Sequence, residues 1–369
     1  MQKYFVYIPA GLIFLLLVAA VISYQNYFFS TIDPNESAQK YSQSQYVLGE
    51  GSPAKISDSE LYEYASYAYW LGEDPATINF EHPPLAKYYY GIFFHLFGNP
   101  YWGSLLLLGL TLVVLLQLSK LLEFGIWAQS LCVLLVGSLS LFQVHTRYAL
   151  LDLPQLLATL LVFMSLLQLE EKSTRLWFII LGTSLGLLLS VKYMIPIIAI
   201  PLLLVVLQSY RKKILLPYLA ALGIAGIVYL VSYTVFFLHQ KNMLDFLAFE
   251  WYRLQWFMGK TDAEKFVIFQ TLFTGSFETW WEPGTYETTM HWSLVWPVSF
   301  VLSVLAAVRA AIVRKYQLLS LLLYSFAVLG LYSIGAAASD RFFIQLLPFW
   351  ILGSVWLLEH FSVLRAAKQ

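Results

Sequence analysis

The stretch that decides the fold is EHPPLAKYYYGIFFHLFG, residues 81–98. Its two adjacent prolines, Pro83 and Pro84, lack backbone N–H groups and fix their own φ angles, so a helix can begin after them but cannot run through them. The apolar part that follows, residues 85–98, would reach only about 21 Å as a helix, against a hydrocarbon core of about 30 Å. We therefore expect a rigid junction, followed by a helix too short to cross a bilayer.

The rest of the chain has the composition of an integral membrane protein. Of its 369 residues, 59% are hydrophobic and 12% are charged, and the mean hydropathy is +0.67, whereas soluble domains carry about 25% charged residues. The formal net charge is zero, so no electrostatic attraction favours a nucleic-acid partner. Ten segments are long and apolar enough to span a bilayer: 4–24, 101–119, 126–145, 149–169, 176–192, 194–210, 214–238, 293–313, 317–337 and 341–360.

The placement of lysines and arginines decides whether 85–98 is a further span. If it does not cross and the N-terminus is cytoplasmic, most cations fall on the inner side: Lys120, Lys172, Arg175, Arg211, Lys212, Lys213, Arg309, Arg314, Lys315, Arg365 and Lys368. The short outer connections then hold Arg147, Lys192 and Arg341. A crossing at 85–98 would reverse this bias, against the positive-inside rule. We therefore expect 85–98 to be a re-entrant or surface-lying outer helix in a multi-pass protein of the cell (plasma) membrane.

Two long polar stretches, about 25–84 and 239–292, lie outside in this topology. With the short helix, the first outer loop extends over 25–100, and both loops are too long to be simple connections. Within the second loop, residues 243–258 (MLDFLAFEWYRLQWFM) have apolar positions at helical spacing and predict an amphipathic helix on the outer leaflet. The whole chain, 1–369, is expected to form one membrane domain.

Charged residues interrupt the apolar pattern at the outer ends of predicted spans. They are Arg147 and Asp152 between the third and fourth spans, Lys192 at the end of the fifth, and Arg341 at the opening of the last. A charge within a span costs about 2.5–3.5 kcal/mol on insertion scales. Their gathering on one side predicts a basic pocket suited to a phosphate. The alternative is a structural ion pair between Arg147 and Asp152, with the other cations extending to lipid headgroups.

The first outer loop supplies carboxylates. In Ser57-Asp-Ser-Glu60, two acids open a helix predicted to run to about Leu71. Ser57 followed three residues later by Glu60 fits a capping box, and Asp58 suits the positive end of the helix. A carboxylate in this position can also act as a general base for a hydroxyl group.

Other polar residues have structural as well as functional interpretations. Glu81 and His82 either fix the proline loop or help to organise a site. The remaining histidines, His291 among them, are too scattered to indicate a metal site, and no HExxH or CxxC spacing is present. Gly182 and Gly186 form a small-xxx-small pair that is typical of helix packing.

Taken in order, these residues resemble the GT-C glycosyltransferases, specifically the protein O-mannosyltransferase-like group of family 39 and the related aminoarabinose transferases. The matching elements are Asp58-Ser-Glu60, His82-Pro-Pro-Leu-Ala-Lys87, Arg147-Tyr-Ala-Leu-Leu-Asp152, Ser190-Val-Lys192-Tyr and Arg341-Phe-Phe-Ile-Gln-Leu-Leu-Pro348. The second element is specific, whereas the others gain weight from their order along nearly the whole chain. The two acids are adjacent in the family and separated here, which leaves open which carboxylate is the base.

The resemblance implies an all-α polytopic bundle of about 10–11 transmembrane helices. It implies an inverting, mannosyltransferase-like reaction that moves a sugar from a polyprenyl (dolichyl-type) phosphate to a protein, lipid or glycan hydroxyl on the extracytoplasmic face. Asp58 would be the base, with Glu60 as its partner or substitute. No cofactor is required, and a divalent cation (Mg or Mn) near Asp58 is allowed. The implied phosphate ligands are Lys87, Arg147, Lys192 and Arg341, the organising residues are Glu81, His82, Asp152 and His291, and loop 239–292, with Glu278, Trp280, Trp281, His291 and Trp292, would close over the substrates.

The main alternative is a multi-pass transporter or a flippase for a phosphate-bearing lipid, in which the charges would line a translocation path. Such proteins often have two matched halves, and no internal repeat is visible in this sequence. A structural membrane protein without catalysis would leave the one-sided clustering of charges unexplained.

Overall fold

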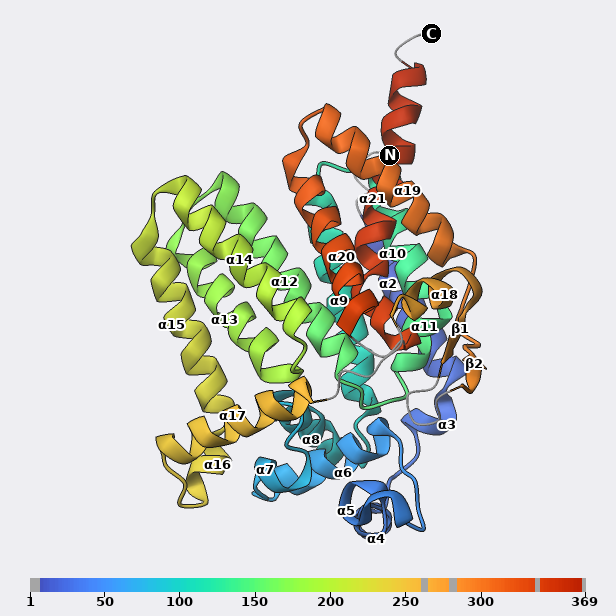
Figure 1. The fold of residues 1–369 in the computed structure, drawn as a ribbon. Helices are drawn as coiled ribbons and strands as arrows, with labels where there is room; N and C mark the ends of the chain where they lie inside the picture. The colour runs from blue at the N-terminus through green and yellow to red at the C-terminus, as the bar shows by residue number, and fades with distance from the viewer. Residues whose placement is uncertain (1–6, 260–264, 279–283, 336–338, 367–369) are drawn as a thin grey trace.

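Apolar helices packed side by side form the body of the protein (Figure 1). The computed structural model describes residues 7–259, 265–278, 284–335 and 339–366. Within these ranges, the helices long and apolar enough to span a membrane are α9 (Tyr101–Leu121), α12 (Asp152–Glu171), α14 (Ile195–Lys212), α15 (Leu215–Ser232), α19 (Val295–Ile312) and α20 (Tyr316–Gly335). Shorter apolar helices are α2 (Ile8–Ser23), α10 (Ile126–Ser138), α13 (Arg175–Val191) and α21 (Leu347–Ala366). Together these helices correspond to the predicted spans, which confirms an all-helical membrane fold.

Two predicted spans are divided. The segment expected at 126–145 breaks at Leu139, where an extended backbone (φ −61°, ψ 130°) separates α10 from α11 (Ser140–His145). The segment expected at 214–238 breaks at Tyr233 into α15 and α16 (Thr234–Leu238). Hydroxyl residues flank each break, Ser138 and Ser140 at the first and Ser232 and Thr234 at the second, but the surrounding segments remain apolar enough for hydropathy to join each into one span.

The last predicted span begins later than expected. Asp340–Gln345 form a 3-10 helix, η2, and α21 begins at Leu347. Arg341 therefore lies in a short connection before the helix, which corrects its expected place at the opening of the span. Its guanidinium group therefore does not carry the cost of a charge within a spanning helix.

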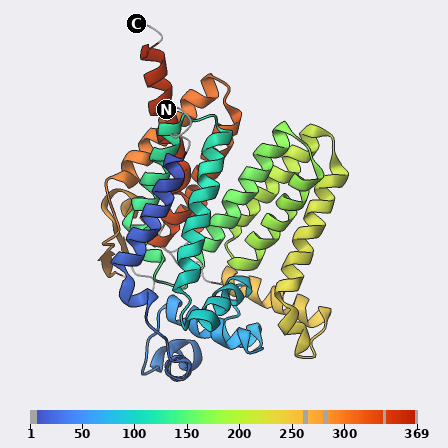
Figure 2. The same cartoon turned by 180° about the vertical axis from the view of Figure 1, so that it is seen from behind.

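The first predicted outer loop folds into short helices at one end of the bundle (Figures 1 and 2). They are α3 (Gln25–Phe28), α4 (Pro34–Ser42), α5 (Gln45–Leu48), the 3-10 turn η1 (Gly49–Gly51), α6 (Asp58–Trp70), α7 (Pro75–Ile78) and α8 (Leu85–Phe97). The short helix expected at 85–98 is α8, which ends at Gly98 in the left-handed conformation (φ 76°). It packs against α6 closely enough that a Cβ on Gly91 would come within 2.6 Å of the Ser66 carbonyl oxygen.

The second predicted outer loop contributes α17 (Met243–Met258), whose bounds match the predicted amphipathic helix and which lies at the same end as α6 and α8 (Figure 1). It is followed by α18 (Val267–Thr274) and by an antiparallel pair of strands, β1 (Ser276–Glu278) and β2 (Tyr286–Thr288), which was not predicted. Glu278 accepts a hydrogen bond from the Gly284 N–H, and Trp292 donates to the Leu272 carbonyl. Trp280 and Trp281 lie outside the described residues.

The turns between α12 and α13, between α14 and α15, and between α19 and α20 lie at the opposite end of the bundle from α6 and α8 (Figure 1). These turns carry many of the cations predicted on the inner side. The two ends of the molecule therefore differ as the charge bias requires: short basic turns at one end, and the long loops with their helices at the other.

Candidate functional site

The start of α6 and the turn η2 bring a carboxylate and a guanidinium group together. Arg341 Nη2 donates to Asp58 Oδ2 at 2.7 Å, and the Tyr46 hydroxyl donates to Asp58 Oδ1 at 2.9 Å. Both charged side chains stay partly accessible, with 33% of Asp58 and 29% of Arg341 exposed. Burial favours a higher pKa for Asp58, but the Arg341 guanidinium and the Tyr46 hydroxyl outweigh it and hold that pKa below its ordinary value. Asp58 is therefore an ionised carboxylate within reach of a ligand.

A second ion pair lies deeper. Lys192 Nζ donates to Asp152 Oδ1 at 2.7 Å, and the two side chains are only 8% and 2% exposed. Gln345 of η2 donates to the Asp152 carbonyl at 2.9 Å, and Gln155 donates to the Lys192 carbonyl at 3.3 Å. The charge of Lys192 also contributes to lowering the pKa of Asp58. The two pairs are thus neighbours, joined through η2.

Arg147 is held by aromatic rings. Its guanidinium carbon lies 5.1 Å from the ring centroids of Tyr24, Tyr27 and Tyr148 alike, and it donates to the Tyr148 hydroxyl at 3.2 Å. Among the described residues, no carboxylate pairs with it. The ion pair between Arg147 and Asp152 that the sequence left open is therefore not formed. An arginine stacked on aromatic faces keeps its charge available for an anionic ligand.

His291 connects the second loop to this region. Its Nδ1 lies 3.0 Å from Ser140 Oγ, and its backbone N–H donates to Thr289 Oγ1 at 3.1 Å. The Thr289 hydroxyl donates to Asp340 at 2.6 Å, next to Arg341 in the chain. Burial and the charge of Arg147 together lower the pKa of His291, against the opposing charge of Asp340. A neutral imidazole thus stands beside the cations.

The proline junction encloses Lys87. This side chain is fully buried, and its Nζ donates to the carbonyls of His82 at 2.8 Å and Pro83 at 3.2 Å. The rings of Tyr62 and Tyr69 lie 5.3 and 5.9 Å from the same atom. In this structure Lys87 supports the loop rather than presenting its charge at a surface, and its role as a phosphate ligand stays a prediction.

Helix α17 covers the other side of the junction. His82 Nδ1 accepts from the Tyr193 N–H at 3.4 Å, and the Phe257 ring lies over both side chains, with centroids 5.9 Å from His82 and 5.0 Å from Tyr193. Burial and the surrounding cations lower the pKa of His82 well below its ordinary value. One of those cations, Arg253, is fully buried, pairs with Glu250 and lies 4.9 Å over the Tyr193 ring. The sequence had placed Arg253 only among the polar residues of an amphipathic helix.

Two other acids of α6 have different surroundings. Glu60 Oε2 accepts from the Ser57 N–H at 2.8 Å and from the Ser57 hydroxyl at 2.9 Å, which completes the predicted capping box. Glu63 is buried and accepts from Ser59 Oγ at 2.9 Å and Tyr101 OH at 3.2 Å. Burial raises the pKa of Glu63 to about 7. Sequence reasoning missed Glu63; the available signal was its position one turn after Ser59, on the face of α6 that packs inward.

The predicted residues thus meet at one end of the bundle. Two ion pairs lie there, Asp58 with Arg341 and Asp152 with Lys192. The imidazoles of His82 and His291 and the guanidinium group of Arg147 lie near them. Glu81 also lies near them. Its charge adds to the effect of burial in raising the pKa of Tyr46, which donates to Asp58. Glu60 and Lys87 are adjacent but engaged in local structure. Within the described part of the chain, no group of three His, Cys, Asp or Glu side chains is arranged to hold a metal ion.

The ten apolar helices of the described ranges, the short helix after the prolines and the one-sided charge network define an all-helical polytopic membrane protein. The fold is similar to that of "ArnT from Cupriavidus metallidurans bound to Undecaprenyl phosphate", with a TM-score of 0.62 and 16% identity over 94% of this chain and 60% of that one. The apo structure of ArnT from the same organism gives a TM-score of 0.54 and 14% identity over 84% of this chain and 56% of that one. The chain thus spans less than two thirds of the length of these proteins.

At the level of sequence, residues 81–237 match the family described as dolichyl-phosphate-mannose-protein mannosyltransferase. No curated protein matches the chain. The resemblance predicted from the sequence is confirmed by the family match and by the fold. The matched range contains the proline junction, Arg147, Asp152 and Lys192, whereas Asp58 and Arg341 lie outside it and join the site only through the fold.

Proposed function

We propose that this chain is a glycosyltransferase that moves a sugar from a polyprenyl-phosphate donor to an acceptor hydroxyl at the end of the bundle that carries α6, α8 and η2. The observation that carries the proposal is the partly exposed pair of Asp58 and Arg341, which places a general base beside a cation suited to phosphate. The match of residues 81–237 to the mannosyltransferase family and the likeness to an ArnT structure bound to undecaprenyl phosphate support it.

In the proposed reaction, the acceptor oxygen attacks the anomeric carbon while the bond from that carbon to the phosphate oxygen breaks. Asp58 takes the acceptor's proton, and the polyprenyl phosphate leaves with its negative charge stabilised by Arg341 and Arg147. Because a phosphate is already a good leaving group, no acid is required. Attack from the face opposite the phosphate inverts the anomeric configuration.

The Asp58–Arg341 contact gives this mechanism an order of events. Arg341 stabilises the ionised form of Asp58 and so lowers its basicity. A donor phosphate that attracts Arg341 would weaken this contact and allow the pKa of Asp58 to rise toward its ordinary value. Donor binding would therefore strengthen the base before the acceptor reacts.

Within this class, the family match favours a mannosyl group on a dolichyl-type carrier and a protein acceptor, and the charge bias favours an extracytoplasmic site. The buried pair of Asp152 and Lys192 would hold η2 against α12. Helix α17 would cover the substrates on the side where it contacts His82. The chemistry requires no cofactor, and a Mg or Mn ion at Asp58 would be an addition to it.

A transfer assay tests the proposal. Purified protein is incubated with radiolabelled polyprenyl-phosphate mannose and serine- or threonine-containing peptides, with EDTA, Mg or Mn added in separate arms. Asp58→Asn should lower the transfer rate about 10²–10⁴-fold, the usual contribution of a general base. Glu60→Gln is the matched control, because its carboxylate caps α6 and should leave the rate near the wild-type value.

The assay also separates the alternatives. Wild-type transfer by a folded Asp58→Asn variant would contradict the assignment of the base. Movement of the lipid between the leaflets of a vesicle without a new glycosidic bond would instead support a flippase.

A further inference from the structure

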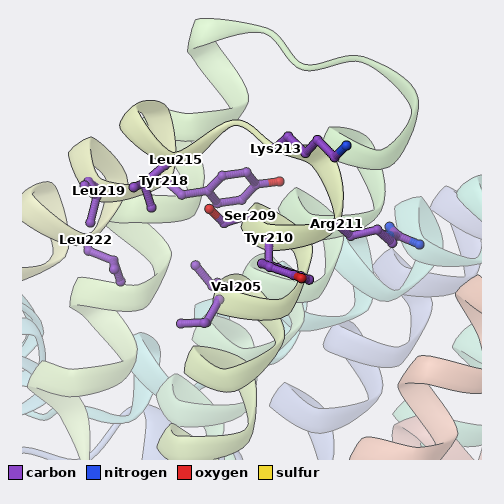
Figure 3. A pocket seen from close by; sticks show the side chains of 10 residues that line it. Val205, Ser209, Tyr210, Arg211, Lys213, Leu215, Tyr218, Leu219 and Leu222 are labelled. Atoms are coloured by element: carbon purple, nitrogen blue, oxygen red, sulfur yellow. The ribbon is translucent and has the colours of Figure 1, made fainter.

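A pocket of about 590 Å³ lies between the end of α14 and the beginning of α15 (Figure 3). The turn between α14 and α15 is at the opposite end of the bundle from the candidate site (Figure 1). Five of the pocket's ten lining residues are aliphatic: Val205, Val206, Leu215, Leu219 and Leu222. Val206, Leu215 and Leu219 are at least half exposed, at 56%, 63% and 50%. The pocket is therefore continuous with the surface of the bundle that would face the bilayer.

One buried polar group in this pocket has no partner among the residues that the structure describes. Tyr218 is 1% exposed, and its hydroxyl makes no hydrogen bond to any of them. In Figure 3 the Tyr218 ring extends across the pocket, with its hydroxyl on the side where Lys213 and Arg211 lie. A buried hydroxyl without a partner is unfavourable, so a ligand atom that bonded to it would recover that loss.

The cations at this end of α14 have different roles. Arg211 pairs with Glu170 of α12, and Lys212 donates to the carbonyls of Leu169 and Glu170 at 2.5 and 3.0 Å. Lys213 is exposed, has a left-handed backbone (φ 56°), and forms no ion pair among the described residues. Its charge is therefore available to a ligand in the pocket that both Lys213 and Tyr218 line.

We propose that this pocket binds one anionic glycerophospholipid of the adjacent leaflet. One acyl chain would lie along the apolar wall, and the phosphate would contact Lys213, Arg211 and the Tyr218 hydroxyl. A lipid fits better than a soluble phosphate because the pocket is mostly apolar and opens toward the membrane. Basic pockets between spanning helices on the cytoplasmic side are suited to anionic headgroups, and this end carries the cations predicted to be inside. The site is independent of the proposed transferase reaction.

Native mass spectrometry of the full-length protein in detergent tests the proposal, with phosphatidylglycerol, phosphatidylcholine and soluble glycerol 3-phosphate as separate ligands. Phosphatidylglycerol should remain bound to the wild type in preference to the other two. Lys213→Gln should weaken that binding about fivefold, the effect of one basic residue near an anionic membrane surface. Tyr218→Phe, which removes only the hydroxyl, should also weaken it without lowering the thermal stability of the delipidated protein, because that hydroxyl has no partner to lose.

Lys172→Gln is the matched control, because Lys172 is an exposed lysine at the same end that does not line the pocket. It should leave the binding of phosphatidylglycerol unchanged. An equal loss in Lys172→Gln and Lys213→Gln would show general surface attraction and overturn the proposal. Equal retention of phosphatidylcholine, or of glycerol 3-phosphate, would overturn it as well.

Discussion

Asp58 and Asp152 both pair with a cation, but in different surroundings. The pair of Asp152 and Lys192 is almost fully buried, so loss of either partner would leave an uncompensated buried charge. The pair of Asp58 and Arg341 is about one third exposed, so Arg341 can exchange its partner for an anionic ligand. The sequence grouped these cations as phosphate ligands of equal standing. In the structure Arg341 is partly exposed, whereas Lys192 is almost fully buried against Asp152, and the role of Lys192 as a phosphate ligand stays a prediction.

Glu63 makes the stability of the protein depend on pH. Burial raises the pKa of its carboxyl group from 4.5 to about 7, so between these values the folded chain binds more protons than the unfolded chain. The stability contributed by Glu63 is therefore lost as the pH rises through this range. Glu63→Gln removes the titration and should stabilise the protein by about 1–3 kcal/mol near pH 8, and by less near pH 5. Thermal unfolding at the two pH values measures this difference, and an equal gain at both would contradict it.

Glu63 and Arg253 also show where prediction from the sequence ends. Both lie on helices that were predicted with the correct bounds. Each has one partner on its own helix and another from a different element: Tyr101 of α9 donates to Glu63, and the hydroxyl of Tyr233, between α15 and α16, accepts from Arg253. A local pattern can place a residue on a helix, but it carries no information on which distant side chain will face it. Asp58 was found because a helix start and a resemblance both pointed to it.

At the scale of the element, hydropathy and capping predicted most of the architecture. The capping box at Ser57 begins α6, and the prolines at 83 and 84 precede α8 as expected. The strand pair β1 and β2 was missed because each strand has only three residues, too few for an alternating pattern to emerge. The 3-10 turn η2 was missed because its six residues, DRFFIQ, include the apolar run Phe342–Ile344 and lead directly into the apolar helix, so the two were read as one span.

The small-xxx-small pair in α13 has the packing role that the sequence indicated. A Cβ on Gly182 would lie 2.5 Å from the Ala221 carbonyl oxygen of α15, and a Cβ on Gly186 would lie 2.5 Å from Val228 Cβ. Gly182→Ala should therefore force the two helices apart and lower stability by about 1–3 kcal/mol. Gly223→Ala on α15 is the control, because no atom of the described residues lies within 4 Å of its Cβ position. Equal thermal unfolding midpoints for the two variants would contradict this account.

At the scale of the whole molecule, the decisive feature is the separation of two kinds of connection. Short basic turns lie at one end of the bundle, and α6, α8 and α17 with the candidate site lie at the other (Figures 1 and 2). The distribution of lysines and arginines allowed this separation to be predicted, because the prediction depends on counting charges, not on knowing contacts. The positive-inside rule also predicts which end faces the cytoplasm, and that assignment has a direct chemical test.

Cysteine labelling in oriented membrane vesicles shows which end of the bundle faces the cytoplasm. The single native cysteine, Cys132, is fully buried, which keeps the background low, and Cys132→Ala removes it. Ser42→Cys at the end of α4 and Ser173→Cys between α12 and α13 occupy exposed positions at opposite ends of the bundle. A membrane-impermeant maleimide should label Ser42→Cys in right-side-out vesicles and Ser173→Cys in inverted ones. The reverse pattern would place the candidate site in the cytoplasm. Labelling of both positions from the same side would contradict the predicted spans, because an odd number of crossings must separate the two positions.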